Sequence, residues 1–347
     1  MISVPKKTPE RQAFYERMSV HSVAPLWEQL AGLLTAEPTT VAQPAIWHYD
    51  DVRPFIMEAG EMITAEEAER RVLMLENPAM RGQARITQSL YAGLQLILPG
   101  EIAPSHRHMA AALRFIVEGE GAYTTVDGEK TIMRPGDLVI TPAWTWHDHG
   151  NDSDEPMVWM DGLDIPMVLF LSSMFAENYA DGVPPITKPV GDSLARYGAG
   201  LLPYGHEATN LNSPMINYPY DRTRHALEKM RGASEWDPCH GLKMRYVNPE
   251  SGESAMPTMS TFMQLLPKDF EAQPYQSTDG AIYSVVEGTG TTQVGTETLH
   301  WAPRDVFVVP SWSRHSHTAS EDAVLFSFSD RVAQEKLGLW RERRGNE

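Results

Sequence analysis

The stretch Pro104-Ser105-His106-Arg107-His108 and, further along, the stretch Trp146-His147-Asp148-His149-Gly150 decide how this chain is organised. Side chains alternate between the two faces of an extended strand, so His106 and His108 point to the same side. A third histidine from another strand, level with that pair, would complete a triangle of imidazoles. Three nitrogen ligands on one face leave the opposite face of a metal ion open, which suits a redox metal that binds substrate and oxygen directly.

Composition and charge are those of a globular protein with room for two domains. The 347 residues can bury one or two cores, and the net charge of −17 argues against nucleic acid and against an anionic membrane as partners. The single cysteine, Cys239, excludes an internal disulfide and fits a reducing compartment. No apolar segment typical of a signal peptide follows Met1, and no apolar run reaches the ~18 residues of a membrane span. We therefore expect a soluble cytoplasmic protein that captures acidic ligands with local arginines.

Short strands with tight glycine and proline turns fill two regions of the chain. Without long helices between them, they predict antiparallel barrels or sandwiches flanked by helices. The strands are expected within residues 86–98, 113–118, 122–126, 131–133, 138–141 and 158–163, and again within 260–266, 281–287, 291–294, 306–309 and 323–329. Helices are expected at residues 9–35 with a break near Pro25, at 64–75 behind a capping-box pattern, at 221–230 and at 331–341.

The two strand-rich regions are related by an internal repeat. Residues 115–121 resemble 284–290, and residues 140–144 resemble 308–312, which places His147 opposite His315. We infer two copies of one β-barrel module.

The copies differ in their chemistry. The positions opposite His106 and His108 are Tyr275 and Ser277, and Tyr283 stands opposite Arg114. The second copy therefore lacks the pair that would complete a metal site, and it is either structural or holds a separate ligand.

Two motifs carry a resemblance to a known family. Gly100-x5-His106-x-His108, followed by Gly136-x5-Pro142-x4-His147-x3-Asn151, resembles the two motifs of the cupin superfamily. More narrowly, residues 103–108, 114–119 and 160–166 resemble gentisate 1,2-dioxygenases and their relatives that cleave salicylate and 1-hydroxy-2-naphthoate. The general cupin glutamate is missing, because alanines and a leucine occupy residues 111–113. This departure argues against decarboxylase and isomerase cupins and favours a site of three histidines.

The resemblance implies an all-β bicupin with two antiparallel jelly-roll barrels and flanking helices. It divides the chain into an N-terminal helical arm at 1–80, a first cupin domain with the metal site at 81–170, an inter-barrel connection at 171–255, a second cupin domain without the metal pair at 256–330 and a C-terminal helix at 331–347.

The resemblance also implies an activity. The expected reaction is Fe(II)-dependent cleavage of gentisate by O2 to maleylpyruvate, between the carboxyl-bearing and hydroxyl-bearing ring carbons, with one Fe(II) per chain bound by His106, His108 and His147. A zinc site or an empty site is the alternative for the metal. Alternatives for the function are the same chemistry on salicylate or 1-hydroxy-2-naphthoate, and a non-catalytic bicupin that binds a small molecule. A homotetramer is implied as the assembly.

Strand parity adds an anion-binding group to this site. If the strand after His108 continues regularly, Ala110, Ala112 and Arg114 face the barrel interior with the histidines. A buried guanidinium requires an anionic partner. That partner is either a substrate carboxylate, which guanidinium binds in a bidentate manner, or the barrel carboxylate Asp161.

Further residues are expected around the same site. Gln95 shares a face with Ile97 and should point inward, and the resemblance assigns substrate contacts to Gln95 and Arg70, although Arg70 and Arg71 also fit a solvated turn. Tyr91 and Trp146 would wall the pocket, or simply pack. Arg114, His149 and Asp161 are the expected catalytic group: His149 would handle protons or support the ligands, and Asp161 would orient His149 or Arg114 or be structural.

Overall fold

A computed structural model describes residue 6 and residues 8–208, 211–233 and 235–345. The chain divides into two compact units, Met1–Thr39 and Thr40–Glu347. The first unit holds the helices α1 (Pro9–Ser19) and α2 (Leu26–Leu33). Pro25 caps α2, so the predicted helical segment with a break near that proline is confirmed. The Trp27 indole N–H donates to the Tyr15 hydroxyl at 2.8 Å and ties the two helices together.

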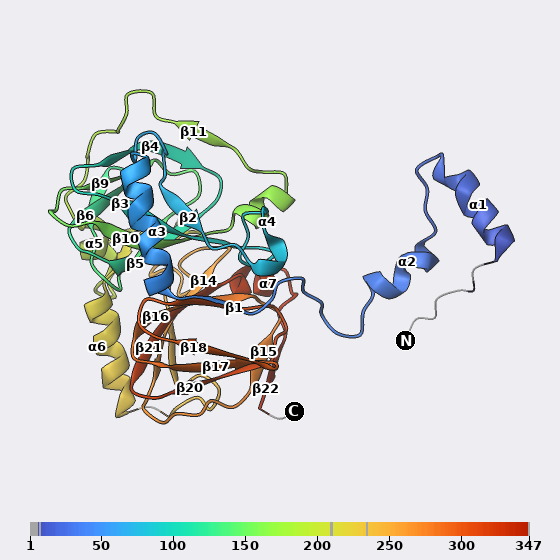
Figure 1. Ribbon diagram of the computed structural model, residues 1–347. Coiled ribbons are helices and arrows are strands. Elements are labelled where there is room, and N and C mark those ends of the chain that lie inside the picture. The colour runs from blue at the N-terminus through green and yellow to red at the C-terminus, as the bar shows by residue number, and fades with distance from the viewer. Residues whose placement is uncertain (1–5, 7, 209–210, 234, 346–347) are drawn as a thin grey trace. The chain divides into compact units, whose positions relative to one another are not determined.

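The second unit contains two β-barrels, each made of two antiparallel sheets (Figure 1). In the first barrel, a six-stranded sheet has the order β12-β8-β5-β10-β3-β2 and a five-stranded sheet has the order β11-β4-β9-β6-β7. Their bounds are β2 Val72–Met74, β3 Tyr91–Ile97, β4 Ile102–His108, β5 Ala112–Glu118, β6 Ala122–Val126, β7 Glu129–Ile132, β8 Leu138–Thr141, β9 His147–Asn151, β10 Met157–Leu163, β11 Ala176–Asn178 and β12 Asn217–Tyr218.

The second barrel repeats this plan. Its sheets have the orders β1-β19-β16-β21-β14-β13 and β18-β17-β20-β15-β22. Their bounds are β1 Ala45–Trp47, β13 Leu242–Arg245, β14 Ser260–Leu266, β15 Tyr275–Ser277, β16 Ala281–Glu287, β17 Gly290–Val294, β18 Glu297–Trp301, β19 Val306–Val309, β20 His315–Ala319, β21 Ala323–Ser329 and β22 Glu342–Arg344. The predicted bicupin architecture is confirmed, and most predicted strands match these bounds within a few residues.

The largest hydrophobic core lies between the two barrels, where their six-stranded sheets face each other. The rings of Phe115 on β5 and Phe326 on β21 stack across this interface at 4.0 Å and 4°. Gly162 on β10 is needed for the close approach, because a Cβ there would lie 2.7 Å from the Phe328 ring. The six-stranded sheets are therefore buried on both faces, which explains why β3, β5 and β10 read as nearly continuous apolar runs.

Strand alternation separates this interface from the barrel interior. On β5, Leu113 and Phe115 belong to the core between the barrels, whereas Ile116 belongs to the interior core of the first barrel. Arg114 and Ala112 share the parity of Ile116 and point inward. This arrangement places the charged face of β5 inside the first barrel.

The prediction of a helix at residues 64–75 is wrong. The Thr64 hydroxyl does accept the Glu67 N–H at 3.1 Å, as in a capping box, but the turn ends at once because Glu69 has a φ of +55°. The following residues pair with β3 instead, with Val72 opposite Gln95. Ladder pairing to a buried strand thus overrides the local helical preference.

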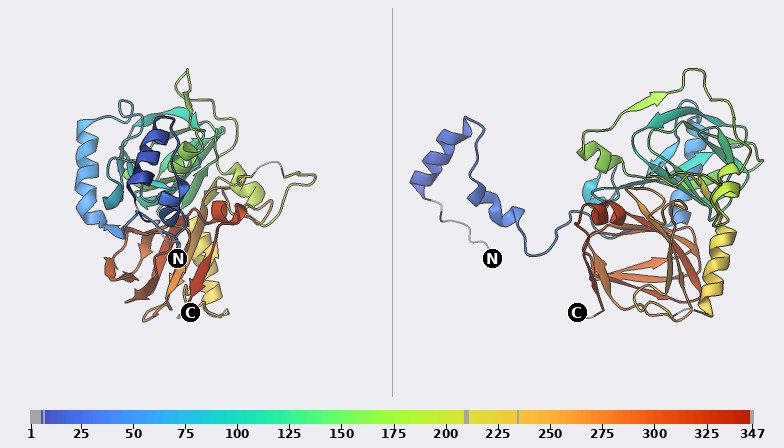
Figure 2. Two further views of the ribbon diagram at one scale, coloured as in Figure 1. Left: turned by 90° about the vertical axis from the view of Figure 1, so that its right-hand side faces the viewer. Right: turned by 180° about the vertical axis from the view of Figure 1, so that it is seen from behind.

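A helix that we did not predict precedes this turn. Helix α3 (Tyr49–Met62) packs on β3 (Figures 1 and 2). Pro54 lies inside this helix, and a proline within a segment argues against a helix when only the sequence is read. Its N-terminus is fixed by Asp305, which accepts the backbone N–H of Tyr49 at 2.9 Å. Residues 40–80, which we assigned to the arm, are part of the same compact unit as the barrels.

The connection and the C-terminus also carry elements of the barrels. The remaining helices are the single 3-10 turn Pro78–Met80, α4 (Ile165–Phe170), α5 (Asp192–Tyr197), α6 (Tyr220–Arg231) and α7 (Arg331–Lys336). Helix α6 confirms the predicted helix at 221–230, and it runs alongside the second barrel (Figure 2).

The predicted C-terminal helix is shorter than expected, because the chain after α7 returns as β22 and pairs with β15. Within the described ranges, no helix has the length and apolar character to cross a membrane.

Candidate metal centre

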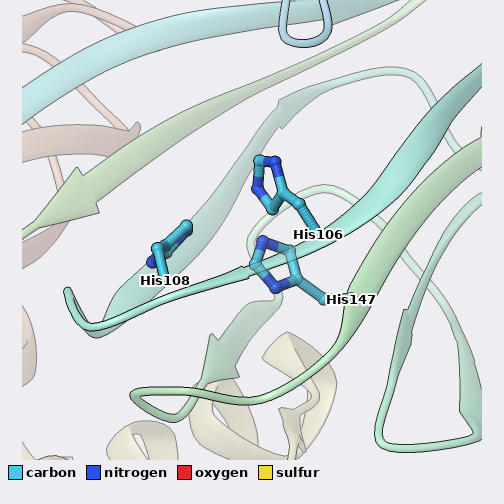
Figure 3. A group of neighbouring side chains, drawn as sticks. All are labelled: His106, His108 and His147. Atoms are coloured by element: carbon cyan, nitrogen blue, oxygen red, sulfur yellow. The ribbon is translucent and has the colours of Figure 1, made fainter. Parts of the chain in front are cut away.

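Three histidines meet inside the first barrel, as the sequence predicted. His106 and His108 come from β4 and His147 from β9, and the register places His106 opposite His147. One potential ligand atom from each residue lies within 4.8 Å of the others. Figure 3 shows the three rings turned toward one another. Among the described residues this is the one group of three or more histidine, cysteine or carboxylate side chains with metal-site spacing.

Backbone carbonyls set which nitrogen of two rings is free. Nδ1 of His108 lies 2.7 Å from the Ala110 carbonyl, and Nδ1 of His147 lies 3.0 Å from the Thr145 carbonyl. A carbonyl only accepts, so both Nδ1 atoms carry the proton and both Nε2 atoms present a lone pair. Nε2 of His106 is buried without a hydrogen-bond partner among the described residues. This donor set fits a metal ion.

Electrostatics keep these imidazoles neutral. Burial, and next the charge of Arg70, lower the pKa of His106 to about 2. Burial also lowers the pKa of His147 well below its ordinary value, with Arg114 as the next cause. A neutral imidazole is the form that can bind a metal, so the lowered pKa values keep His106 and His147 in that form.

Arg114 lies on the cavity wall, where strand parity placed it. Its Nη1 donates to the Thr141 hydroxyl at 2.6 Å. Its Nε is buried without a hydrogen bond and lies 3.7 Å from the Asp161 carboxylate, which is an ion-pair distance but longer than a hydrogen bond. Trp159 donates its indole N–H to the same Asp161 oxygen at 3.0 Å. The guanidinium therefore retains hydrogen-bonding capacity for a further anion.

Two adjacent arginines that the sequence left ambiguous point in opposite directions. Arg70 lines the cavity, and its Nη1 donates to the Pro104 carbonyl at 3.0 Å. Arg71 points away and pairs with Glu101, with an Nη1–Oε1 distance of 2.8 Å. Burial, and next the charge of Arg114, lower the pKa of Arg70 to about 10. Two guanidinium groups in one apolar cavity favour a bound carboxylate, which would relieve their repulsion.

The cavity beside the three histidines has a volume of 420 Å³ and is largely apolar. Gln95 and Tyr91 line it, as predicted, and Ala110 and Ala112 leave its centre open. The sequence reasoning missed the apolar remainder of the lining, which consists of Val72, Met74, Ala84, Leu163, Ile165 and Met174. Arg70, Val72 and Met74 follow the period of two of a strand, so reading this segment as a strand would have found them.

Trp146 lies outside this cavity, contrary to the expectation that it walls the pocket. Because His147 points inward, its neighbour Trp146 points to the other side of the strand. There it stacks on Arg107, whose guanidinium carbon lies 4.5 Å from the centre of the indole ring and 4.3 Å from that of Trp144. Trp146 thus belongs to a separate groove of the barrel surface.

His149 lies deeper in the barrel than the cavity, with its ring 5.8 Å from that of His147. The Thr124 hydroxyl donates to the Asp148 carbonyl at 3.0 Å, so its oxygen accepts the Nδ1–H of His149 at 2.8 Å. Nε2 of His149 is then a buried acceptor, and it has no partner in the described part of the chain.

The second barrel retains this threonine–histidine pair but not the metal site. Thr292 lies 2.8 Å from Nδ1 of His317, in the same relation as Thr124 and His149. Tyr275 stands opposite His315, where the first barrel has His106 opposite His147. The cavity at this place has a volume of only 20 Å³, because Tyr275 and Tyr283 help to line it. It cannot hold an aromatic substrate.

Comparisons with known proteins agree with this geometry. Residues 93–165 match the family model of the cupin domain. The chain is 58% identical to gentisate 1,2 dioxygenase 1 of Aquipseudomonas alcaligenes over 340 residues, which cover 98% of each chain. It is 36% identical to a 5-aminosalicylate 1,2-dioxygenase of a Comamonas species, covering 95% of this chain and 89% of that protein.

A solved structure of similar fold has been determined with an aromatic ligand. The crystal structure of salicylate 1,2-dioxygenase from Pseudoaminobacter salicylatoxidans, as an adduct with gentisate, superposes with a TM-score of 0.93 at 35% identity. The alignment covers 99% of this chain and 96% of that chain.

Proposed function

The chain belongs to the gentisate 1,2-dioxygenase family of ring-cleaving cupin dioxygenases, and from that premise we propose that it converts gentisate and O2 to maleylpyruvate. The ring would be cleaved between the carbon that bears the carboxylate and the adjacent carbon that bears a hydroxyl. The observation that carries this proposal is Arg114: a buried guanidinium on the wall of the cavity that the three histidines line, whose one hydrogen bond among the described residues goes to Thr141.

We propose Fe(II) as the metal, held by His106, His108 and His147. The all-nitrogen donor set of neutral imidazoles suits iron and leaves coordination positions open for other ligands. When bound, the iron supplies the redox chemistry for O2, while the protein supplies orientation and electrostatics.

The chain's own residues would orient the substrate in the cavity. Its carboxylate would pair with Arg114 and Arg70, and this pairing would offset the burial and the repulsion from Arg114 that lower the pKa of Arg70. Burial raises the pKa of Tyr91, so its hydroxyl remains a neutral donor, and the Gln95 amide can donate and accept. These two cavity-lining groups would bind the ring hydroxyls. Asp161 would orient Arg114 through their ion pair. His149, whose ring lies 5.8 Å from that of His147, would help to fix the position of the His147 ring.

The function is tested by substrate-dependent oxygen consumption. The protein is loaded with Fe(II) under anaerobic conditions and then given O2 with gentisate, salicylate, 5-aminosalicylate or 1-hydroxy-2-naphthoate in parallel. We expect the highest kcat/KM with gentisate, together with a product that absorbs in the near ultraviolet. If another substrate is turned over and gentisate is not, the substrate assignment is wrong. If none consumes oxygen in the iron-loaded protein, the assignment of the whole reaction fails.

We also propose a homotetramer in the cytoplasm. Helices α1 and α2 contain no buried residue, and apolar side chains such as Leu26 and Leu33 are exposed at 58% and 62%. Burying such side chains against another copy is favourable, which supports a multimer. The buried free thiol of Cys239 supports a reducing compartment. Light scattering coupled to size-exclusion chromatography tests the tetramer, and deletion of residues 1–39 should shift it to a smaller species.

A further inference from the structure

A second apolar pocket lies away from the metal centre, where α5 and α6 meet the edge of the second barrel. It has a volume of 220 Å³. For comparison, an apolar cavity of about 150 Å³ can hold a benzene molecule. Its apolar lining includes Leu194, Met215, Ala226, Met244 and Met263. Three methionines make the lining adaptable in shape, because the thioether side chain is unbranched and flexible.

Two arginines stand at this pocket without a carboxylate partner. Arg222 on α6 and Arg245 on β13 both line it and are both exposed. Arg222 donates from Nη1 to the Gly198 carbonyl at 3.2 Å, and Arg245 from Nη2 to the Gly252 carbonyl at 3.0 Å. Neither forms an ion pair within the described ranges, although the chain has 46 acidic residues. Their neighbours on α6, Arg224 and Arg231, are both paired with acidic residues.

A buried hydroxyl of a residue that lines this pocket also lacks a hydrogen bond among the described residues. Tyr246 lines the pocket and is 7% exposed, yet its hydroxyl has no hydrogen bond among the described residues. The Thr223 side chain lies nearby but not in normal hydrogen-bond geometry. By contrast, the hydroxyl of the adjacent Tyr218 contacts Ser213 at 2.7 Å and the Val247 carbonyl at 2.8 Å. A buried polar group without a partner usually has a water molecule or a ligand beside it.

Gly198 allows one arginine to reach the pocket. A Cβ at this position would lie 2.5 Å from the Leu194 carbonyl and 3.1 Å from Nη1 of Arg222. The glycine therefore lets α5 end close to Arg222, with the guanidinium held against the backbone at the pocket edge.

We propose that this pocket is a second binding site, distinct from the metal centre, for a small amphipathic carboxylate. The apolar body would occupy the methionine-lined cavity against the ring of Tyr246, and the carboxylate would pair with Arg222 and Arg245. Guanidinium binds carboxylate with charge-assisted hydrogen bonds, and the cavity volume limits the ligand to about one ring or a short alkyl chain. An aromatic acid and a short fatty acid share this chemistry.

The pocket is connected to the metal site through one strand. Tyr218 on β12 pairs with Leu138 on β8, and β8 ends at Thr141, whose hydroxyl accepts the hydrogen bond from Arg114. Binding of a ligand in this pocket does not require turnover at the metal centre. The binding experiment below can therefore fail or succeed independently of the test of the proposed function.

Bromine-labelled ligands test the site directly. Crystals of the iron-loaded protein are soaked in 4-bromobenzoate, in 6-bromohexanoate or in the neutral 4-bromobenzamide, and bromine is located by anomalous scattering. We expect a peak in this pocket for at least one of the two acids and none for the amide. A peak from one acid alone identifies its class as the ligand. Bromine only in the cavity beside the three histidines, or in neither place, would overturn the proposal.

Variants distinguish binding by the pocket arginines from a general effect of the protein's charge on ligand affinity. In Arg222→Met/Arg245→Met, calorimetric affinity for the bound acid should fall roughly tenfold to a hundredfold. The control Lys229→Met/Lys268→Met removes the same charge from exposed positions outside the pocket lining and should keep the affinity. Ala226→Leu fills the cavity without altering charge and should abolish binding. Equal losses in the arginine and lysine variants, or full affinity in Ala226→Leu, would refute the site.

Discussion

Tyr275 pairs with His315 in the second barrel at the register where His106 pairs with His147 in the first. One duplicated module therefore carries a metal-binding arrangement in one copy and a filled, polar interior in the other. The second barrel serves as an internal control for each functional residue, since it shares the framework and lacks the three-histidine group.

The first prediction concerns metal content. His106→Gln and His147→Gln each remove one of the three proposed ligands, and the affinity for iron should fall by on the order of a hundredfold or more. His315→Gln alters the corresponding position of the second barrel and should retain one iron per chain. Metal analysis after anaerobic loading and desalting measures this. Equal iron in His106→Gln and His315→Gln would show that the three histidines do not bind it.

The second prediction concerns the carboxylate of the substrate. Arg114→Met should lower kcat/KM on the order of a hundredfold or more, because charge-assisted contacts to the substrate are lost. Iron content should be unchanged, since Arg114 is not a ligand. Steady-state kinetics with measured iron occupancy checks both statements.

Loss of the buried guanidinium also leaves Asp161 unpaired, so stability needs its own control. The double variant Arg114→Met/Asp161→Asn removes both charges and should recover the melting temperature of the wild type more closely than the single variant. It should not recover kcat/KM. If activity returned with stability, Arg114 would be structural.

The fold could be predicted from the sequence because its signals are local and repeated. Pro/Gly turns and period-two alternation determine the strands, and the repeat of residues 115–121 at 284–290 reveals two barrels. Parity alone placed Arg114 and Gln95 inside the cavity. Each of these inferences depends on a strand of several residues whose period is unambiguous.

Other parts depend on contacts that a sequence does not display. The segment after Thr64 carries a helix-start pattern, but pairing with β3 makes Val72–Met74 a strand and brings Arg70 and Met74 to the cavity. Met174 reaches the cavity from a connection with no period at all. Trp146 was expected either to wall the pocket or simply to pack, and its position next to the inward-facing His147 would have assigned it to the outside.

The third prediction uses the duplicated threonine–histidine pairs. Thr124→Val and Thr292→Val each remove a hydroxyl at 2.8 Å from a buried Nδ1, so both should lose about 1 to 3 kcal/mol of unfolding free energy. Only Thr124→Val should lower kcat, because His149 lies beside His147, one of the proposed metal ligands. Denaturant titration and initial rates measure the two effects. If kcat is unchanged in Thr124→Val, the pair is structural in both barrels.

The last prediction is a pH dependence in the second barrel. Lys243 lines the small cavity there, and burial lowers the pKa of its ammonium group from 10.5 to about 8. Nζ lies 4.8 Å from the centre of the Phe262 ring and 5.9 Å from that of Tyr283, and no carboxylate lies within ion-pair distance among the described residues. A charged amine is therefore costly in this cavity.

The sign follows from proton binding in the two states. Below about pH 8 both the folded and the unfolded chain hold the proton on Lys243, and the cost of burying the charge is fully present. Between about pH 8 and 10.5 the unfolded chain binds more protons, so the stability contribution of this residue rises with pH. Lys243→Met should thus be more stable than the wild type at neutral pH, by on the order of 1 to 3 kcal/mol, and the difference should shrink toward pH 10. Exposed Lys229→Met is the control, and an identical pH slope in the two variants would mean that the Lys243 ammonium is not destabilised by its cavity.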